Sequence, residues 1–158
     1  MTKKLHHMAF RCRDSEETRA FYEEIIGLPL VATLPIEETK TGRRTRVLHT
    51  FFAMEDGSHL AFFEAPDQPF EFKAQHDFDL HVAMEASQEA VDKALAAAKA
   101  RGLEIRGPSD HGFIKSYYFR DPNGYVVELT QKTDSAPEYE KTARTEARAI
   151  LDRWKAEA

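Results

Sequence analysis

His7-Met8-Ala9-Phe10 and His81-Val82-Ala83-Met84 are two short alternating stretches that begin with histidine and lie 74 positions apart. Each is followed by a segment of helical spacing and then by a glycine-leucine pair, Gly27-Leu28 in the first case and Gly102-Leu103 in the second. Self-similarity at a fixed separation is typical of a repeated structural unit. The sequence therefore predicts two copies of one unit.

Each copy is predicted to contain a strand, a helix and three further strands. The helices are indicated by apolar residues at i, i+3 and i+4 spacing around residues 18–26 and 91–98. Turn-forming pairs at 56–57 and 123–124 precede the last strand of each copy. The strands that follow the helices are expected at 28–33, 44–54 and 58–64 in the first copy and at 103–106, 115–120 and 125–131 in the second.

The predicted fold is of the α+β class, with two βαβββ modules and a C-terminal helix. Module one is expected at residues 5–64 and module two at 78–131, within a domain of residues 1–132. Residues 65–77 contain two prolines and are interpreted as a linker. A capping-box pattern introduces a helix at 135–157, whose apolar stripe either packs on its own domain or contacts a second chain.

Composition excludes several classes of function. The 158 residues carry 22 Lys and Arg against 27 Asp and Glu, a net charge of −5 that argues against nucleic-acid binding through phosphate contacts. The single cysteine, Cys12, excludes an intramolecular disulfide framework and is interpreted as a small buried hydrophobe. We find no run of about 20 apolar residues and no signal-peptide pattern, so we expect no membrane partner and a cytoplasmic location.

Three potential metal ligands follow from the alternation of side chains along strands. His7 and Ala9 share one face of their strand and the larger apolar residues share the other, which leaves His7 pointing away from the helices. The same parity applies to His81 in the second copy. Counted from the turn glycines, Glu128 and Ala61 occupy equivalent places on the two last strands. Two imidazoles and one carboxylate, with other positions open, form the facial set that favours Fe(II).

A plainer interpretation of the same residues stays open. His7 and His81 would then be ordinary strand histidines, and Glu128 would be an ion-pair partner within an apolar strand. Their matched places in the two copies favour the metal site. A structural zinc site is disfavoured, because it would need four protein ligands, often including cysteine.

Two motifs frame the repeated units: His7–Asp14 followed by Phe21-Tyr22, and Asp121–Glu128 near the close. On these motifs residues 5–131 resemble the vicinal oxygen chelate superfamily, which includes glyoxalase I, extradiol dioxygenases, fosfomycin-resistance proteins and bleomycin-binding proteins. The resemblance implies paired modules that form a cupped mixed sheet around a divalent metal. It also implies four ligands in glyoxalase-type members and two histidines with one glutamate in extradiol dioxygenases. Ala61 removes the fourth ligand here.

A longer match resembles the extradiol signature. It runs from His111 through Tyr118 to Glu128, and departs from the family at Tyr117, where an aliphatic residue or phenylalanine is preferred, and at Ser109. The resemblance implies that Tyr118 orients a substrate hydroxyl and that His111 hydrogen-bonds the substrate or the oxygen species. The alternatives are that Tyr118 is a core aromatic residue and His111 a solvated loop residue.

The family's acid-base histidine lies on the last strand of the first copy. His59 is the candidate for it, because it lies two residues from Ala61 and shares the inward face. His49 and His76 are interpreted as surface or packing residues.

These residues predict an Fe(II)-dependent extradiol-type dioxygenase that cleaves a small catechol-like substrate with O2, and we expect a homodimer. A glyoxalase- or lyase-type enzyme using Mn(II), Ni(II) or Zn(II) is one alternative. A metal-free module that binds a small aromatic compound is another, since 11% of the residues are aromatic. The predicted catalytic residues are His111, Tyr118 and His59, and the predicted metal ligands are His7, His81 and Glu128.

Overall fold

Each repeated histidine begins a strand that pairs in parallel with the last strand of its own module. The structure, a computed structural model, describes residues 1–157. The strands are β1 His7–Cys12, β2 Leu30–Glu38, β3 Arg44–Ala53, β4 His59–Glu64, β5 His81–Glu85, β6 Ile105–Asp110, β7 Ile114–Arg120 and β8 Val126–Lys132. They form two sheets of order β1-β4-β3-β2 and β5-β8-β7-β6. The β1–β4 and β5–β8 pairs are parallel and the others antiparallel, so both sheets are mixed.

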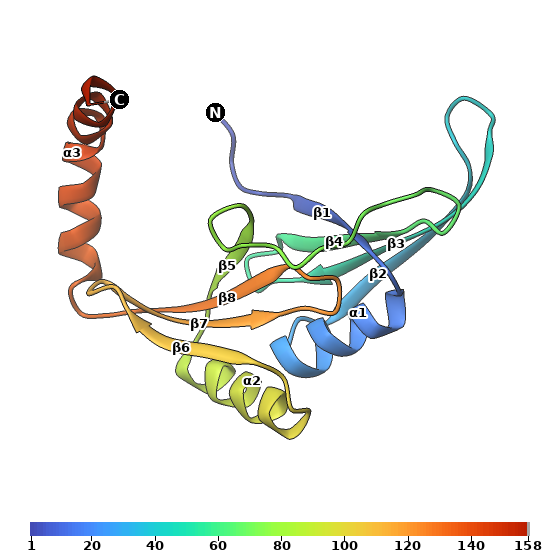
Figure 1. Ribbon diagram of the computed structural model, residues 1–158, viewed down its shortest axis with the longest axis horizontal. Helices are drawn as coiled ribbons and strands as arrows, with labels where there is room; N and C mark the ends of the chain where they lie inside the picture. Colours follow the sequence, from blue (N-terminus) through green and yellow to red (C-terminus); the bar gives the residue numbers. More distant parts are fainter. Residues whose placement is uncertain (158) are drawn as a thin grey trace.

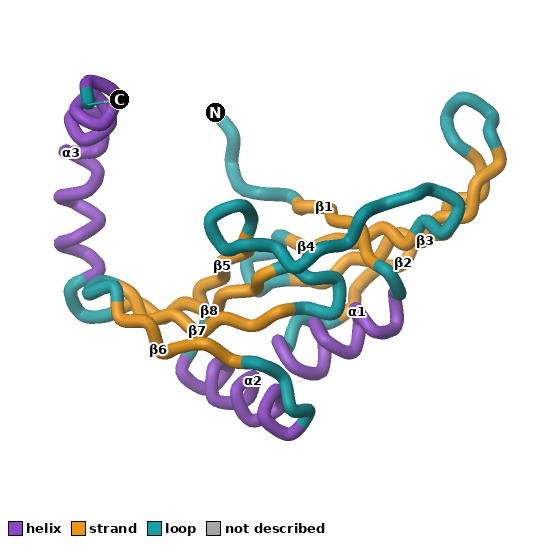
Figure 2. The backbone as a smooth tube through the Cα atoms, viewed as in Figure 1, coloured by secondary structure: helices purple, strands orange, loops and turns teal. Residues whose placement is uncertain are grey.

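The helices complete two matched βαβββ modules and confirm the predicted α+β fold. They are α1 Ser15–Phe21, continued by the π-helical turn η1 Tyr22–Ile26, then α2 Gln88–Ala100 and α3 Ala136–Ala156. Figure 1 and Figure 2 show α1 and α2 on the same side of the two sheets. We call the opposite sheet surface the inward face; the segment between β4 and β5 runs along that side of the molecule (Figure 1).

One hydrophobic core joins the helix-facing sides of both sheets. The ring of Tyr22 in η1 packs at a tilt against that of Phe62 in β4, with centroids 4.7 Å apart, and Val91 and Val127 belong to the same cluster. Along β5 the second and fourth residues are buried and the others exposed, as a strand with one face on a core requires. The predicted division of this strand into a helix-facing and an inward face is therefore confirmed.

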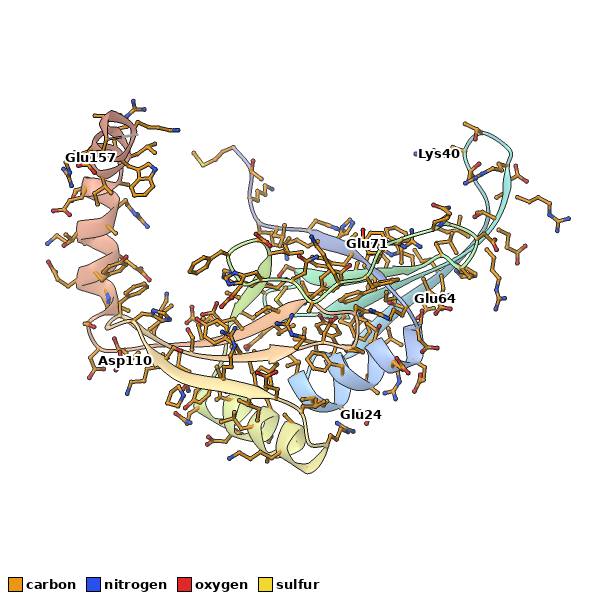
Figure 3. The ribbon with its side chains drawn as sticks, viewed as in Figure 1. Glu24, Lys40, Glu64, Glu71, Asp110 and Glu157 are labelled. Atoms are coloured by element: carbon orange, nitrogen blue, oxygen red, sulfur yellow. The ribbon has the colours of Figure 1, made fainter. Side chains whose placement is uncertain are left out.

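The strand boundaries differ from the prediction at β6, which was expected at 103–106 and spans Ile105–Asp110, and at β2, which was expected to end at residue 33 and instead continues to Glu38. It continues because β3 offers backbone partners as far as Arg44, which pairs with Glu38. Pro35 is tolerated within it because β2 is an edge strand, where a missing amide donor costs little. Lys40, labelled in Figure 3, marks the tip of this long hairpin at the end of the molecule away from α3.

The side chain of Asn123 holds the two modules together, and its removal is expected to destabilise the fold. Its Oδ1 accepts from the backbone N–H of Arg13 at 2.8 Å, and its Nδ2 donates to Oγ1 of Thr18 at 3.2 Å. Asn123→Ala leaves buried partners unsatisfied and is expected to lower the free energy of unfolding by about 2–4 kcal/mol in urea titrations. Gln88→Ala, at an exposed amide, is the control and should change it by less than about 0.5 kcal/mol. An equal effect of both substitutions would contradict this role.

Cys12 is the buried hydrophobe that the sequence predicts, and it should resist thiol reagents. Only 2% of the residue is exposed, and burial raises the pKa of its thiol from 9.0 to about 11. We expect no labelling by a disulfide reagent at pH 8 in the native state and one thiol labelled in urea. Because the folded-state pKa is the higher one, the protonated thiol's contribution to stability is complete below pH 9 and is lost as the pH rises through 11. Rapid native labelling would contradict the packing.

Helix α3 contacts the rest of the chain mainly at its start. Tyr139 stacks on Phe113 with ring centroids 3.7 Å apart, whereas Ile150, Leu151 and Trp154 are 49%, 51% and 70% exposed. The interpretation that the whole apolar stripe packs on its own domain is therefore wrong, and contact with a second chain stays a prediction. Within residues 1–157 no helix has the length and apolar character needed to cross a membrane.

Candidate metal centre

His81 and Glu128 meet on the inward face of module two. His81 begins β5, and Glu128 lies on β8, where its Cα is paired with that of Ala83. The Nε2 atom of His81 lies 3.3 Å from Oε2 of Glu128. His81 is partly exposed, but Glu128 is only 5% exposed, and His81 is its only ion-pair partner within residues 1–157. A buried carboxylate without a strong cationic partner is costly, so this pair is suited to share a cation.

A backbone carbonyl orients the ring of His81 through the nitrogen that does not face Glu128. Its Nδ1 atom donates to the carbonyl oxygen of Asp77 at 2.5 Å. With the Nδ1 proton engaged, Nε2 is the nitrogen that faces Glu128. This is the arrangement in which a histidine ligand uses one nitrogen for metal and the other for an outer hydrogen bond.

Tyr118 and His111 extend the same cluster. The Cα of Tyr118 on β7 is paired with that of Glu128, so their side chains emerge on the same face as neighbours. Burial, followed by the nearby Glu128 carboxylate, raises the pKa of the Tyr118 phenol above its usual range. His111, in the turn between β6 and β7, places Nε2 within 3.3 Å of the Tyr118 hydroxyl. Four of the six predicted site residues therefore form one connected group.

His7 and His59 lie on the other sheet. They are paired neighbours at the start of β1 and β4, and both are on the inward face of module one. The Nδ1 atom of His7 lies 2.7 Å from Nδ1 of the adjacent His6. Within residues 1–157 no three metal-binding side chains are close enough to hold one ion. A single chain thus brings His81 and Glu128 together but does not bring His7 to them.

The register confirms the equivalence of Ala61 and Glu128. Ala61 is paired with Ala9 on β1 in the way that Glu128 is paired with Ala83 on β5. Ala61 is fully buried on this face, next to Phe51, its partner on β3. Module one therefore offers an aromatic wall where module two offers a carboxylate.

His49 is a packing residue, as interpreted from the sequence, but its place on the inward face was not expected. Its ring stacks on Phe63 with centroids 3.6 Å apart and lies 6.2 Å from the ring of His7. Burial lowers the pKa of His49, which favours the neutral form of the ring. Strand parity on β3, where Phe51 lies opposite Ala61, is the signal that would have placed it.

The inward arginines already have partners inside the chain. Arg11 donates to the carbonyl oxygens of Ala65 and Gln68 at 2.9 and 2.8 Å. Arg120 donates to those of Gln75 and Gly124 at 2.9 and 3.0 Å. Arg106 pairs with Asp77 at 3.0 Å. Each guanidinium group therefore already donates to acceptors of this chain, although the buried Nε atom of Arg11 has no hydrogen-bond partner within residues 1–157.

A family model described as the Glyoxalase/Bleomycin resistance protein/Dioxygenase superfamily matches residues 4–129. The chain belongs to this superfamily. The match spans both modules and ends within β8, so α3 lies outside it. The family resemblance drawn from the two framing motifs is confirmed.

Solved structures share the superfamily fold. The fosfomycin resistance protein FosX from Listeria monocytogenes, in a mutant form complexed with Mn(II) and 1S,2S-dihydroxypropylphosphonic acid, has 22% identity over 85% of this chain and 97% of its own, with a TM-score of 0.62. A glyoxalase/dioxygenase from Nostoc punctiforme has 24% identity over 84% and 92%, with a TM-score of 0.63. A glyoxylase/bleomycin resistance protein/dioxygenase domain from Frankia sp. EAN1pec has 14% identity over 85% and 95%, with a TM-score of 0.66. No curated protein sequence matches this chain. Identities this low establish the fold alone.

The donor set of this superfamily member fits a divalent cation in part. An imidazole nitrogen and a buried carboxylate oxygen already face each other in module two. One more imidazole would complete the facial set, and the exposed His7 of module one carries it on an inward face.

Proposed function

We propose that the protein is a divalent-metal-dependent enzyme whose site forms between two copies of the chain. In this arrangement His81 and Glu128 of one copy are joined by His7 of the other. The observation that carries the proposal is the contact of His81 with the buried carboxylate of Glu128. The separation of His7 from that pair within one chain is the reason for the second copy.

The reaction that this group of residues supports best is extradiol ring cleavage of a small catechol. Fe(II) held by these three donors would act as a Lewis acid on the diol and leave positions for its two oxygens and for O2. Tyr118, whose pKa is raised, stays protonated and donates a hydrogen bond that orients a substrate oxygen. His111, next to that hydroxyl, holds or accepts a proton at Nε2. His59 stays a candidate base, since it lies on the same inward face as His7.

The engaged arginines favour a neutral diol over a phosphonate dianion. A dianion needs guanidinium or ammonium donors directed at its oxygens. Terminal guanidinium nitrogens of Arg11, Arg106 and Arg120 are each directed at acceptors of this chain instead. The phenyl rings of Phe51 and Phe63, beside His49, offer an apolar wall that suits an aromatic ring.

A redox-inert glyoxalase-, lyase- or hydrolase-type reaction with Mn(II), Ni(II) or Zn(II) is the second candidate. The similarity in fold to FosX structures, two of them in complex with Mn(II), favours it. A metal-free module that sequesters an aromatic compound is the third candidate, and the same aromatic wall favours it.

Anaerobic purification with elemental analysis, followed by loading with each metal, separates these functions. We expect Fe(II)-loaded protein to consume O2 and form a yellow ring-fission product with at least one member of a catechol panel. Glu128→Gln should abolish the reaction, while Glu85→Gln, an exposed carboxylate on neighbouring β5, should not. Turnover of an epoxide or a hemithioacetal without O2 would support the second candidate. Ligand binding that a chelator leaves unchanged would support the third.

A further inference from the structure

Arg106 contacts both Tyr118 and Asp77, the residue whose carbonyl orients His81. It lies on β6 with its Cα paired with that of Tyr118 on β7. Its guanidinium carbon lies 5.0 Å from the centroid of the Tyr118 ring, a cation–π distance. Its NH2 group also donates to Oδ2 of Asp77 at 3.0 Å. One side chain thus contacts Tyr118 directly and reaches the residue that orients His81.

Asp77 has two separate roles in this contact. Its carboxylate accepts from Arg106, and its backbone carbonyl accepts from Nδ1 of His81. The segment from Asp77 to His81 turns tightly, because the amides of Asp79 and Leu80 both donate to the carbonyl of His76. Fixing the carboxylate therefore fixes the carbonyl that orients the imidazole ring.

The pair is too exposed to contribute much to global stability. The side chains of Arg106 and Asp77 are 48% and 24% exposed, and ion pairs of this kind contribute at most about 1 kcal/mol to the free energy of unfolding. A contribution to the overall stability of the fold therefore does not account for this ion pair. Its contacts instead converge on His81 and Tyr118.

We propose that Arg106 and Asp77 form a positioning pair, in which the Arg106–Asp77 contact holds the Asp77 carbonyl against His81 Nδ1 and so directs Nε2 toward Glu128. The use of His81 as a metal ligand rests on the proposed function, whereas the orientation of its ring does not. Arg106 is a positioning residue for His81 through Asp77 and for Tyr118 through its ring.

Arg106→Gln and Asp77→Asn each remove the ion pair while leaving the Asp77 carbonyl in the chain. In nitrogen-15 NMR of the metal-free protein, the wild-type His81 Nδ1–H should give a downfield signal protected from exchange with water. We expect both variants to lose that protection, and to bind Zn(II) and Mn(II) about 10–100-fold more weakly in calorimetric titrations. The double variant should be no weaker than either single variant, because each change breaks the same contact.

Two further variants distinguish positioning from a structural role. Arg106→Lys keeps a cation for Asp77 and should retain the protected Nδ1–H signal. Arg101→Gln breaks a comparably exposed ion pair with Glu24 on the helix side and should change neither readout. The free energy of unfolding should stay within about 1 kcal/mol of wild type in every variant.

An Nδ1–H signal that stays protected in Arg106→Gln would overturn the proposal, and so would unchanged affinity in that variant for a metal that the wild type binds. If the wild type binds neither metal, the proposed function fails, and the Nδ1–H signal alone then decides whether the positioning pair exists.

Discussion

Glu128→Gln is expected to lower the affinity for divalent metals by about 100-fold or more while leaving the metal-free fold intact. The substitution removes the anionic donor but keeps the volume of a side chain that is 5% exposed. Because a neutral amide costs less to bury than an unneutralised carboxylate, the free energy of unfolding of the metal-free protein should stay the same or rise by about 1 kcal/mol. Calorimetric metal titration and urea unfolding measure the two effects.

The control for this result is Glu85→Gln, which removes an exposed carboxylate two residues after Ala83, the strand partner of Glu128. It should leave metal affinity within about twofold of wild type, since the exposed Glu85 carboxylate is already paired with Lys132 and exposed ion pairs contribute little. Retention of tight metal binding in Glu128→Gln would remove the central donor from the proposed site. A large loss of stability in the metal-free variant would instead identify Glu128 as a structural ion-pair partner of His81.

The second large effect is recovery of metal binding when two inactive variants are mixed. His7→Ala and His81→Ala should each bind no metal at the site when prepared alone. If every site takes His7 from one copy and His81 from the other, a dimer with one chain of each kind has one intact site. Random pairing after joint refolding should then restore about a quarter of the wild-type sites, because a two-fold dimer contains each contact twice. Metal content after gel filtration measures the recovery.

A matched mixture tests this arrangement. His81→Ala and Glu128→Ala change donors that one chain supplies together, so their mixed dimers contain no intact site. This second mixture should recover nothing. Equal absence of binding in both mixtures would show that His7 acts within its own chain or not at all, and a monomeric protein in gel filtration would contradict the shared site directly.

Most of the site residues could be predicted from strand parity. Side chains alternate between the two faces of a strand, and a turn of known position fixes the residue from which the alternation is counted. Parity placed His7, His81 and Glu128 on inward faces, and it matched Ala61 to Glu128 before any register was known. It also placed Tyr118 beside Glu128, since both residues are counted from the same hairpin.

Contacts outside the strands could not be predicted in this way. Asp77 falls in a segment interpreted as a linker, where no periodicity indicates that its carbonyl reaches His81. Parity also predicts on which face of a sheet a side chain lies, but it does not predict the distance between potential ligands on the two sheets. The distance between His7 and the His81–Glu128 pair depends on how the modules pack at Asn123 and Tyr22, which is a tertiary effect.

The buried methyl group of Ala61 has an evolutionary consequence. If the two halves descend from one duplicated ancestor, the place next to Ala9 once had the same freedom to hold a donor as the place next to Ala83. Phe51 and the stacked pair of His49 and Phe63 now fill the surface around it. Restoring a carboxylate at residue 61 would require these rings to repack as well. A single substitution would therefore not readily give module one the carboxylate that module two has at Glu128.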